Sequence, residues 1–322
     1  MLFRSTKGPH KVGLRALLDA AGLNGKTIDS YHIGFMVAPR INAAGRMSTP
    51  DIATRLLLAS DESMADEARL LAEQLEAENT RRRQEDQDIL AKAKKIVETD
   101  PEVGSRTVLV VAGEGWHRGV IGIVASKLVD AFYRPAIVLS IEDGVAHGSC
   151  RSITGFDMLA CLESCAPLMT RFGGHKAAAG LQIDASRIKE FRQAVNDHAD
   201  GCLSPDDLRP SLWLDGPLAL NDISDQVMAE FARLAPFGPG NPRPKFHTGP
   251  VSLVDGPRLL KERHLKMTLK QNNRILRAIQ WNAAEHNDRL VAKKDGVEIA
   301  YTVEENEFQG NRYVELRLED FR

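Results

Sequence analysis

The sequence is poor in the features that mark secreted and membrane proteins. Its 322 residues include only four cysteines, too few for a disulfide scaffold, and no apolar run long enough to cross a bilayer. The first residues, MLFRSTKGPHK, lack the apolar core of a signal peptide. The net charge of −2 excludes a uniformly basic coat, although a local basic site remains open. We therefore expect a cytoplasmic protein without membrane attachment.

Common catalytic and metal-binding signatures are also missing. The sequence has no Walker A motif and no nucleophile elbow. Asp86 and Asp88 stand two apart in a helical pattern, so their side chains point to different faces and make a poor metal pair. Cys161 and Cys165, taken with Cys150, show no Cys-x2-Cys spacing. We expect these cysteines to be buried free thiols rather than zinc ligands.

The first hundred residues read as helical. Residues 1–60 contain a short helix, GLRALLDAAGL, then a loop, HIGFMVAPRINAAGRM, and a second helix, TPDIATRLLLAS. The stretch 61–99 has no proline or glycine, and its apolar residues recur at helical spacing among dense charges. This pattern predicts one helix of more than thirty residues. A helix of that length usually connects two domains or lies along both.

The remaining sequence predicts an α/β domain followed by an all-β domain. Residues 103–200 alternate strands such as TVLVV and AIVLS with helices such as GVIGIVASKLVDAF, which is typical of one α/β domain. A linker, LSPDDLRP, follows. Within 205–322, the strand-like segments HLKMTLK, ILRAIQW, VEIAYTV and RYVELRLEDF come at short spacing, and we expect no helix between them. They predict a small β-barrel or sandwich.

Two junctions of the α/β region carry groups suited to an anion. In GEGWHRGVIGIV a strand leads into a helix, where free N–H groups and the helix dipole favour an anion and His117 and Arg118 add donors. In HGSCRS, Ser149, Arg151 and Ser152 combine two hydroxyls with a planar guanidinium, which suits phosphate. An ordinary tight turn and a surface turn are the alternatives.

A third junction, FGGHKAAAGL, places Gly173 and Gly174 before His175. Glycine permits positive φ and close approach of another group, and small residues on both sides indicate that this group is a ligand. A single histidine is more often structural than catalytic. Because all three junctions need the same class of ligand, they favour one phosphate site together.

Two further segments offer basic side chains. PRINAAGRM carries Arg40 and Arg46 around Asn42, and a capping loop with solvated arginines is its alternative. The segment 258–277 has seven Lys or Arg against one acid. Alternation there places Lys266 and Lys270 on one strand face, which suits the backbone of a single strand, although a solvated outer face would look the same. The candidate strand contacts of the barrel are Lys266, Lys270 and Arg274.

Together these pieces resemble one family. PRINAAGRM, NTRRRQEDQDIL, GWHRGVIGIVASKL, GSCRS, FGGHKAAAGL, PFGPGNPRPKF and AYTVEENEFQGNRYVELRLEDFR follow the order seen in RecJ, the bacterial single-strand-specific exonucleases of the DHH phosphoesterase superfamily. The resemblance covers essentially the whole chain. It implies a multidomain α/β plus all-β chain: the C-terminal remnant of a DHH domain (1–60), a long interdomain helix (61–99), a DHH-associated substrate-binding α/β domain (103–200) and an OB-fold (205–322).

The resemblance implies that the metal chemistry of RecJ proteins depends on motifs that this sequence lacks. RecJ proteins digest single-stranded DNA from the 5′ end with Mn²⁺ or Mg²⁺, which aspartates and histidines of the DHH half hold. None of those motifs, including Asp-His-His, occurs in this sequence. The resemblance therefore implies a chain that binds no metal, is inactive alone, and receives its missing DHH half in cis or in trans.

Substrate contacts do carry over by motif match. The resemblance implies that Ser149, Arg151 and Ser152 hold the 5′-terminal phosphate or its neighbouring backbone. Further expected contacts are Arg40, Asn42 and Arg46 facing the same cleft, His117 and Arg118 at the helix mouth, and Gly173, Gly174 and His175 near the scissile region, with an assisting role for His175. Single-stranded DNA is the expected ligand, and a single-strand binding protein or a helicase is a further candidate partner.

Two other functions stay open on the sequence. A non-catalytic module for single-stranded nucleic acid would keep the clamp and the barrel without chemistry. A phosphoesterase for small oligonucleotides would use a similar glycine–histidine motif, but the barrel favours long strands.

Overall fold

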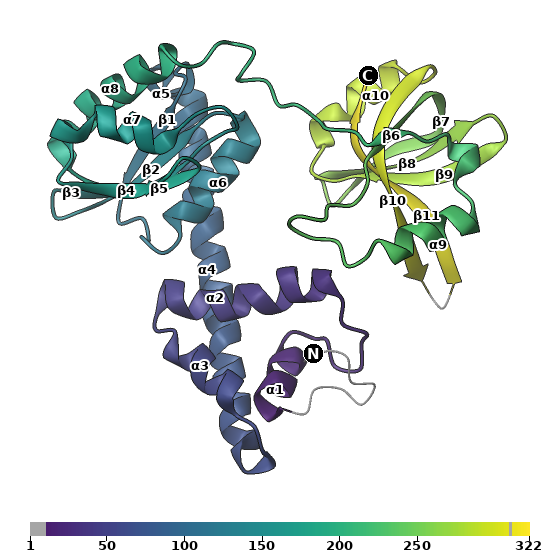
Figure 1. The fold of residues 1–322 in the computed structure, drawn as a ribbon, viewed down its shortest axis with the longest axis horizontal. Coiled ribbons are helices and arrows are strands. Elements are labelled where there is room, and N and C mark those ends of the chain that lie inside the picture. Colours follow the sequence, from purple (N-terminus) through teal and green to yellow (C-terminus); the bar gives the residue numbers. More distant parts are fainter. Residues whose placement is uncertain (1–10, 309–310) are drawn as a thin grey trace. The chain divides into compact units, whose positions relative to one another are not determined.

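A computed structural model describes residues 11–308 and 311–322, and the chain divides into two units, Met1–Pro210 and Ser211–Arg322. In the first unit (Figure 1) the helices are α1 (Val12–Ala20), α2 (Ala38–Met47), α3 (Asp51–Leu58), α4 (Ala65–Thr99), α5 (Pro101–Gly104), α6 (Ile121–Phe132), α7 (Met158–Ser164) and α8 (Ile188–Asp200). Its strands are β1 (Leu109–Glu114), β2 (Ala136–Glu142), β3 (Val145–Arg151), β4 (Arg171–His175) and β5 (Ala178–Asp184). Within the described ranges, no helix combines the length and the apolar character that a bilayer span requires.

The long helix expected over 61–99 is confirmed as α4, an uninterrupted helix of 35 residues. Leu71 and Leu75 of its first half are buried in the core that α1 and α3 share. Ile89 and Ala93 of its second half are buried with residues of α6 and β1. One helix thus contributes to two hydrophobic cores of the first unit. In Figure 1, α4 runs as one long helix from α2 and α3 up to the sheet.

The loop expected in HIGFMVAPRINAAGRM is wrong. His32–Val37 form a π-helix that continues directly into α2. Pro39 lies in the first turn of α2, directly after the π-helix. Ala43 and Ala44 are buried, so the small residues of this segment serve helix packing. Glycine, proline and asparagine in this segment are typical of loops. The helix could not be predicted from the segment alone, because the contacts that stabilise α2 come from other segments.

The sheet of the first unit has the order β1-β2-β3-β5-β4. Strands β1 and β2 are parallel with α6 as their crossover, and the other neighbours are antiparallel. One side of the sheet is buried with α7 and α8, and the other side is buried with α6 and α4 over β1 and β2. Strand β4 was not expected, because its sequence RFGGH lacks the β-branched residues that mark strands.

The outer strands leave part of one side exposed. In β5, Ala179, Leu181 and Ile183 are buried whereas Gly180 between them is exposed. Gly173 of β4 is exposed as well. We call this side of β5 and β4, with β3 at its border, the open face. It brings together two of the junctions that the sequence singled out.

The second unit is a five-stranded barrel consistent with an OB-fold. Its elements are β6 (Gly216–Pro217), α9 (Asp225–Arg233), β7 (Phe246–Leu260), β8 (His264–Gln271), β9 (Arg274–Gln280), α10 (Asn287–Ala292), β10 (Val297–Phe308) and β11 (Asn311–Phe321). The barrel order is β7-β8-β9-β11-β10, and β10 pairs with β7 to close it. The expectation of no helix between the strands is wrong, since α10 separates β9 from β10. Its six residues are too short for helical periodicity to register in the sequence.

Candidate phosphate-binding site

Strand register places the second and third junctions on one face. Arg151 pairs with Ala178, and Ala178 pairs with His175. Paired residues in a sheet project to the same side, so Arg151 and His175 share the open face, roughly 10 Å apart across two strand spacings. The neighbouring row consists of Ser149 (β3), Gly180 (β5) and Gly173 (β4). The two motifs are therefore parts of one surface.

The centre of the open face is bare backbone. A Cβ on Gly173 would meet nothing within 4 Å, and one on Gly180 would meet only the Gly148 carbonyl oxygen, at 3.6 Å. Gly174 differs, since its φ is +154° and its Cβ would lie 2.5 Å from the Ala178 oxygen. Gly174 is thus required by the hairpin itself, whereas Gly173 and Gly180 leave space that a ligand can enter.

Arg151 lies against the beginning of α6. Its Nη1 donates to Ser149 Oγ at 3.2 Å and to the Cys150 carbonyl at 2.8 Å. A Cβ on Gly122, the second residue of α6, would lie 3.1 Å from Arg151 Nη2 and 3.0 Å from Ser149 Oγ. Gly122 therefore admits the guanidinium, a role that sequence reasoning missed. The positive end of the helix dipole and a positive side chain converge here, which an anion would stabilise.

The first junction and α2 border the same helix end. Arg46 Nη1 donates to the Gly119 carbonyl at 3.0 Å, and His117 Nδ1 accepts from the Gly119 N–H at 3.1 Å. On the open face, His175 Nδ1 accepts from the Ala177 N–H at 3.2 Å. A neutral imidazole that accepts at Nδ1 carries its proton on Nε2. Both histidines therefore offer Nε2–H as a donor.

Other predicted contacts have partners elsewhere or none. Arg40 forms an ion pair with Glu76 of α4 and also bonds the Met36 carbonyl. The Ser152 hydroxyl donates to the Phe156 carbonyl at 2.7 Å, which holds the loop after β3. Two more side chains are exposed and form no hydrogen bond within the described ranges: Asn42 and Arg118. The substrate roles of these four residues stay predictions.

A charged cluster on α4 was missed by sequence reasoning. Asp86 is buried, and its Oδ2 accepts from Lys127 Nζ of α6 at 2.6 Å and lies 3.9 Å from Arg82. Burial lowers the pKa of Arg82; Asp86 opposes this shift, and the charges of Arg83 and Arg46 add to it. Asp86 thus ties α4 to α6, and the only sequence signal was the run of arginines in NTRRRQEDQ.

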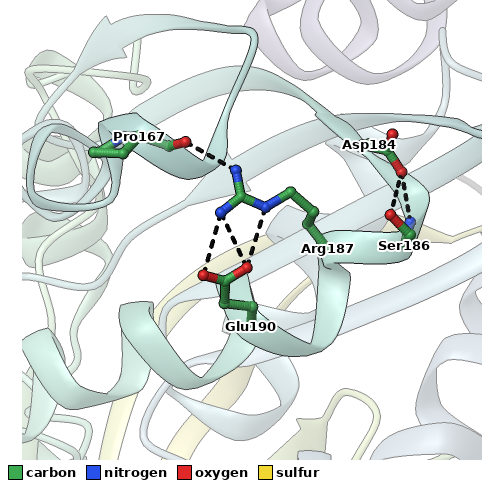
Figure 2. Close-up of polar contacts among 5 residues, drawn as sticks. All are labelled: Pro167, Asp184, Ser186, Arg187 and Glu190. Atoms are coloured by element: carbon green, nitrogen blue, oxygen red, sulfur yellow. Dashed lines mark hydrogen bonds and ion pairs between the residues drawn. The ribbon is translucent and has the colours of Figure 1, made fainter.

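The ends of the hairpin β4–β5 are fixed by polar contacts (Figure 2). Arg187 Nη1 donates to the Pro167 carbonyl at 2.9 Å, and its Nε and Nη2 donate to the Glu190 carboxylate at 3.1 and 3.2 Å. Asp184 accepts from the Ser186 N–H and hydroxyl, and the hydroxyl bond is the main cause that lowers the pKa of Asp184. The segment that enters β4 and the turn that leaves β5 are thereby held to α8.

The described residues offer no site that fits a divalent metal. Across residues 11–308 and 311–322, no three His, Cys, Asp or Glu side chains gather where they could hold an ion. The site instead offers a guanidinium, a hydroxyl, imidazole N–H groups and a helix N-terminus, which are donors to an anion. All four cysteines are free, and Cys150, Cys161 and Cys165 are buried, as expected. Burial raises the pKa of Cys150 to about 12.

The barrel carries a second candidate surface. Lys266 and Lys270 are exposed on β8 whereas Leu265, Met267 and Leu269 are buried, so the predicted alternation is confirmed. Register adds Arg258 opposite Lys266 and Arg277 opposite Thr268 on the same side. We call Arg258, Lys266, Lys270 and Arg277 the basic face. Arg274 belongs to the opposite side of β9, because it pairs with Gln271 and not with one of the residues of the basic face. Its Nη2 donates to the Ile223 carbonyl at 3.2 Å.

Comparison with known proteins identifies the two domains. Residues 105–200 match the DHHA1 domain model and residues 214–320 match the RecJ OB domain model. The chain is a homologue of the RecJ exonucleases. The further division of the preceding residues into a DHH remnant and an interdomain helix stays a prediction.

Known RecJ proteins match nearly the whole chain but extend well beyond it. The single-stranded-DNA-specific exonuclease RecJ of Bacillus subtilis is 34% identical over 97% of this chain and 39% of its own length, and that of Escherichia coli is 32% identical over 98% and 56%. The crystal structure of Thermus thermophilus RecJ with Mn²⁺ superposes with a TM-score of 0.80 at 31% identity, over 97% of this chain and 44% of that one. The chain thus spans about half the length of the relatives it matches.

Proposed function

We propose that this chain supplies the part of a RecJ-type 5′–3′ exonuclease that holds the 5′ phosphate and the strand of single-stranded DNA. The observation that supports the proposal most is the convergence of Arg151 with the N-terminus of α6 beside a bare glycine surface. Such a convergence of positive charge is stabilised by an anion, and a terminal phosphate has the charge and the acceptor oxygens for it.

The open face explains how a strand end would be held. The 5′ phosphate accepts from Arg151 Nη2 at the positive end of the α6 dipole, while Gly180 and Gly173 let the backbone lie directly on the sheet. His175 lies in the same row as Arg151, two strands away, and its Nε2–H is a donor for a further phosphate oxygen. Ser149 orients the guanidinium through the bond to its hydroxyl. Each of these groups binds or orients, and none of them activates water.

The metal chemistry belongs, in this proposal, to another part of the enzyme. Solved RecJ structures contain Mn²⁺ or Mg²⁺. The described residues of this chain gather no metal-binding cluster, so the DHH half would contribute the ions in cis or in trans. The barrel would bind the strand backbone through the basic face, in keeping with the use of OB-folds for single strands.

Removal of the Arg151 guanidinium tests the clamp. Arg151→Ala should weaken binding of a 5′-phosphorylated thymidine oligonucleotide by about tenfold to a hundredfold, because a charge-assisted hydrogen bond to the phosphate is lost. Fluorescence anisotropy with a 3′-labelled oligonucleotide measures this. Arg209→Ala removes an exposed arginine of the same unit and serves as the control, with affinity expected to stay within about twofold. Equal affinities of the two variants would remove Arg151 from the clamp.

A non-catalytic binding module is the second candidate, and the absence of a metal-binding cluster from the described ranges favours it. Both functions predict that the purified chain alone does not hydrolyse 5′-phosphorylated single strands in the presence of Mn²⁺. They separate when the N-terminal half of a RecJ relative is added. Restored cleavage that EDTA abolishes supports the exonuclease part, and binding without restored cleavage supports the module.

A further inference from the structure

A third row of polar side chains continues the open face beyond the proposed clamp. His147 of β3 pairs with Gln182 of β5, and Gln182 pairs with Arg171 of β4. These residues stand two positions from Ser149, Gly180 and Gly173, so they project from the same side. The spacing between the two rows is roughly 6.8 Å along the strands.

The three side chains of this row are available to a ligand. Arg171 is exposed, and His147 and Gln182 are half-buried. Within the part of the chain that the structure describes, none of the three side chains takes part in a hydrogen bond or an ion pair. The guanidinium of Arg187, in contrast, is engaged by Glu190 and the Pro167 carbonyl. Arg171 therefore lacks the local structural role that Arg187 performs.

The row is also the last donor position along this strip. The next residue on the same side of β5 is Asp184, whose carboxylate is engaged by Ser186. Donors thus lie on both sides of the bare row of Gly180 and Gly173, and beyond them the open face ends at the carboxylate of Asp184. A strand that starts at Arg151 would cross the glycines and arrive at this row.

We propose that His147, Gln182 and Arg171 form a second subsite, which takes the second internal phosphate after the 5′-terminal one. The inference rests on the proposed function, because it assumes that the terminal phosphate lies at Arg151. A guanidinium and a side-chain amide are donors to phosphate oxygens, and Arg171 supplies the positive charge. This row lies two row spacings from the Arg151 row, roughly 13.6 Å along the strands. That is about twice the distance between successive phosphates of an extended single strand, which argues for a polynucleotide rather than a lone phosphate.

Ligand length tests this subsite. The wild-type chain should bind a 5′-phosphorylated thymidine trinucleotide more tightly than thymidine 5′-monophosphate, because only the trinucleotide reaches Arg171. Arg171→Ala should weaken trinucleotide binding by about fivefold to tenfold and leave mononucleotide binding within about twofold. The slope of log affinity against log salt concentration should fall by about 0.7 for the trinucleotide. Titration monitored by NMR covers both affinities.

Two further variants keep the outcome clear. Arg171→Lys should retain part of the trinucleotide affinity because the charge remains, and Arg209→Ala should change neither ligand. If Arg171→Ala binds the trinucleotide as the wild type does, the subsite is overturned while the 5′-phosphate clamp stands. If the wild type binds the 5′-phosphorylated trinucleotide and thymidine 5′-monophosphate no more tightly than a 5′-hydroxyl trinucleotide, the proposed function fails and the subsite fails with it.

Discussion

The open face of the sheet and the basic face of the barrel would meet the same polymer in different ways. At the clamp on the open face, Arg151 is a fixed donor, held by the Ser149 hydroxyl and the Cys150 carbonyl. On the basic face, Lys266 and Lys270 are exposed charges on a strand. Fixed donors on bare backbone can distinguish a terminal phosphate from an internal one, whereas exposed charges respond to the polyanion as a whole.

The two adjacent glycines of β4 give the sharpest test of the open face. Gly174→Ala should lower the free energy of unfolding by about 1–3 kcal/mol, because a Cβ at that φ meets the Ala178 backbone. Gly173→Ala should leave the free energy of unfolding within about 0.5 kcal/mol, since its Cβ enters open space. Denaturant titration measures both.

Binding by the same pair completes the test. Gly173→Ala should weaken binding of the 5′-phosphorylated oligonucleotide although the fold is intact, because the added methyl group occupies the space assigned to the ligand. Normal binding by a stable Gly173→Ala chain would show that the strand does not lie on the open face.

Charge removal tests the basic face and should give a smaller effect. Replacement of Lys266 and Lys270 by glutamine should lower the slope of log affinity against log salt concentration by about 0.7 for each lysine. The loss should be equal for 5′-phosphorylated and 5′-hydroxyl oligonucleotides, because neither lysine contacts the terminus. A loss confined to the phosphorylated ligand would contradict the contrast between the two faces.

The smallest expected effect is a difference in the salt dependence of binding between variants of two arginines of β9. Arg277 shares the basic face, whereas Arg274 is out of phase with it and bonds the Ile223 carbonyl. Arg277→Gln should lower the salt dependence of binding as one lysine replacement does, and Arg274→Gln should leave it nearly unchanged. The reverse result would favour the sequence-based choice of Arg274 over the choice made from strand register.

Local sequence was sufficient for most elements of the fold. The charged, glycine-free run predicted α4, and alternation predicted which side of β8 is buried, because each depends on residues adjacent along the chain. It failed where other segments decide the outcome. Segment 38–47 is a helix because its small residues pack against α4 and neighbouring helices, and the glycine-containing β4 is a strand because β5 supplies its hydrogen bonds.

The candidate site shows the same division. Ser149 and Arg151 lie two residues apart on one strand, so the sequence alone could pair them. Gly122, Gln182 and Arg171 escaped notice because their positions depend on the placement of α6 and on the register of strands distant in the chain. Sequence motifs therefore predicted the residues of the proposed clamp, whereas its surroundings required the folded sheet.

The most direct test of the 5′-phosphate clamp is the ratio of two dissociation constants of the unmodified chain, for the same single-stranded oligonucleotide with a 5′-hydroxyl and with a 5′-phosphate. The account predicts that the phosphorylated strand binds at least about tenfold more tightly, through charge-assisted bonds at Arg151 and the favourable dipole of α6. It also predicts that Arg151→Ala brings the ratio close to one. Equal affinities in the unmodified chain would contradict the assignment of a terminal phosphate to this face.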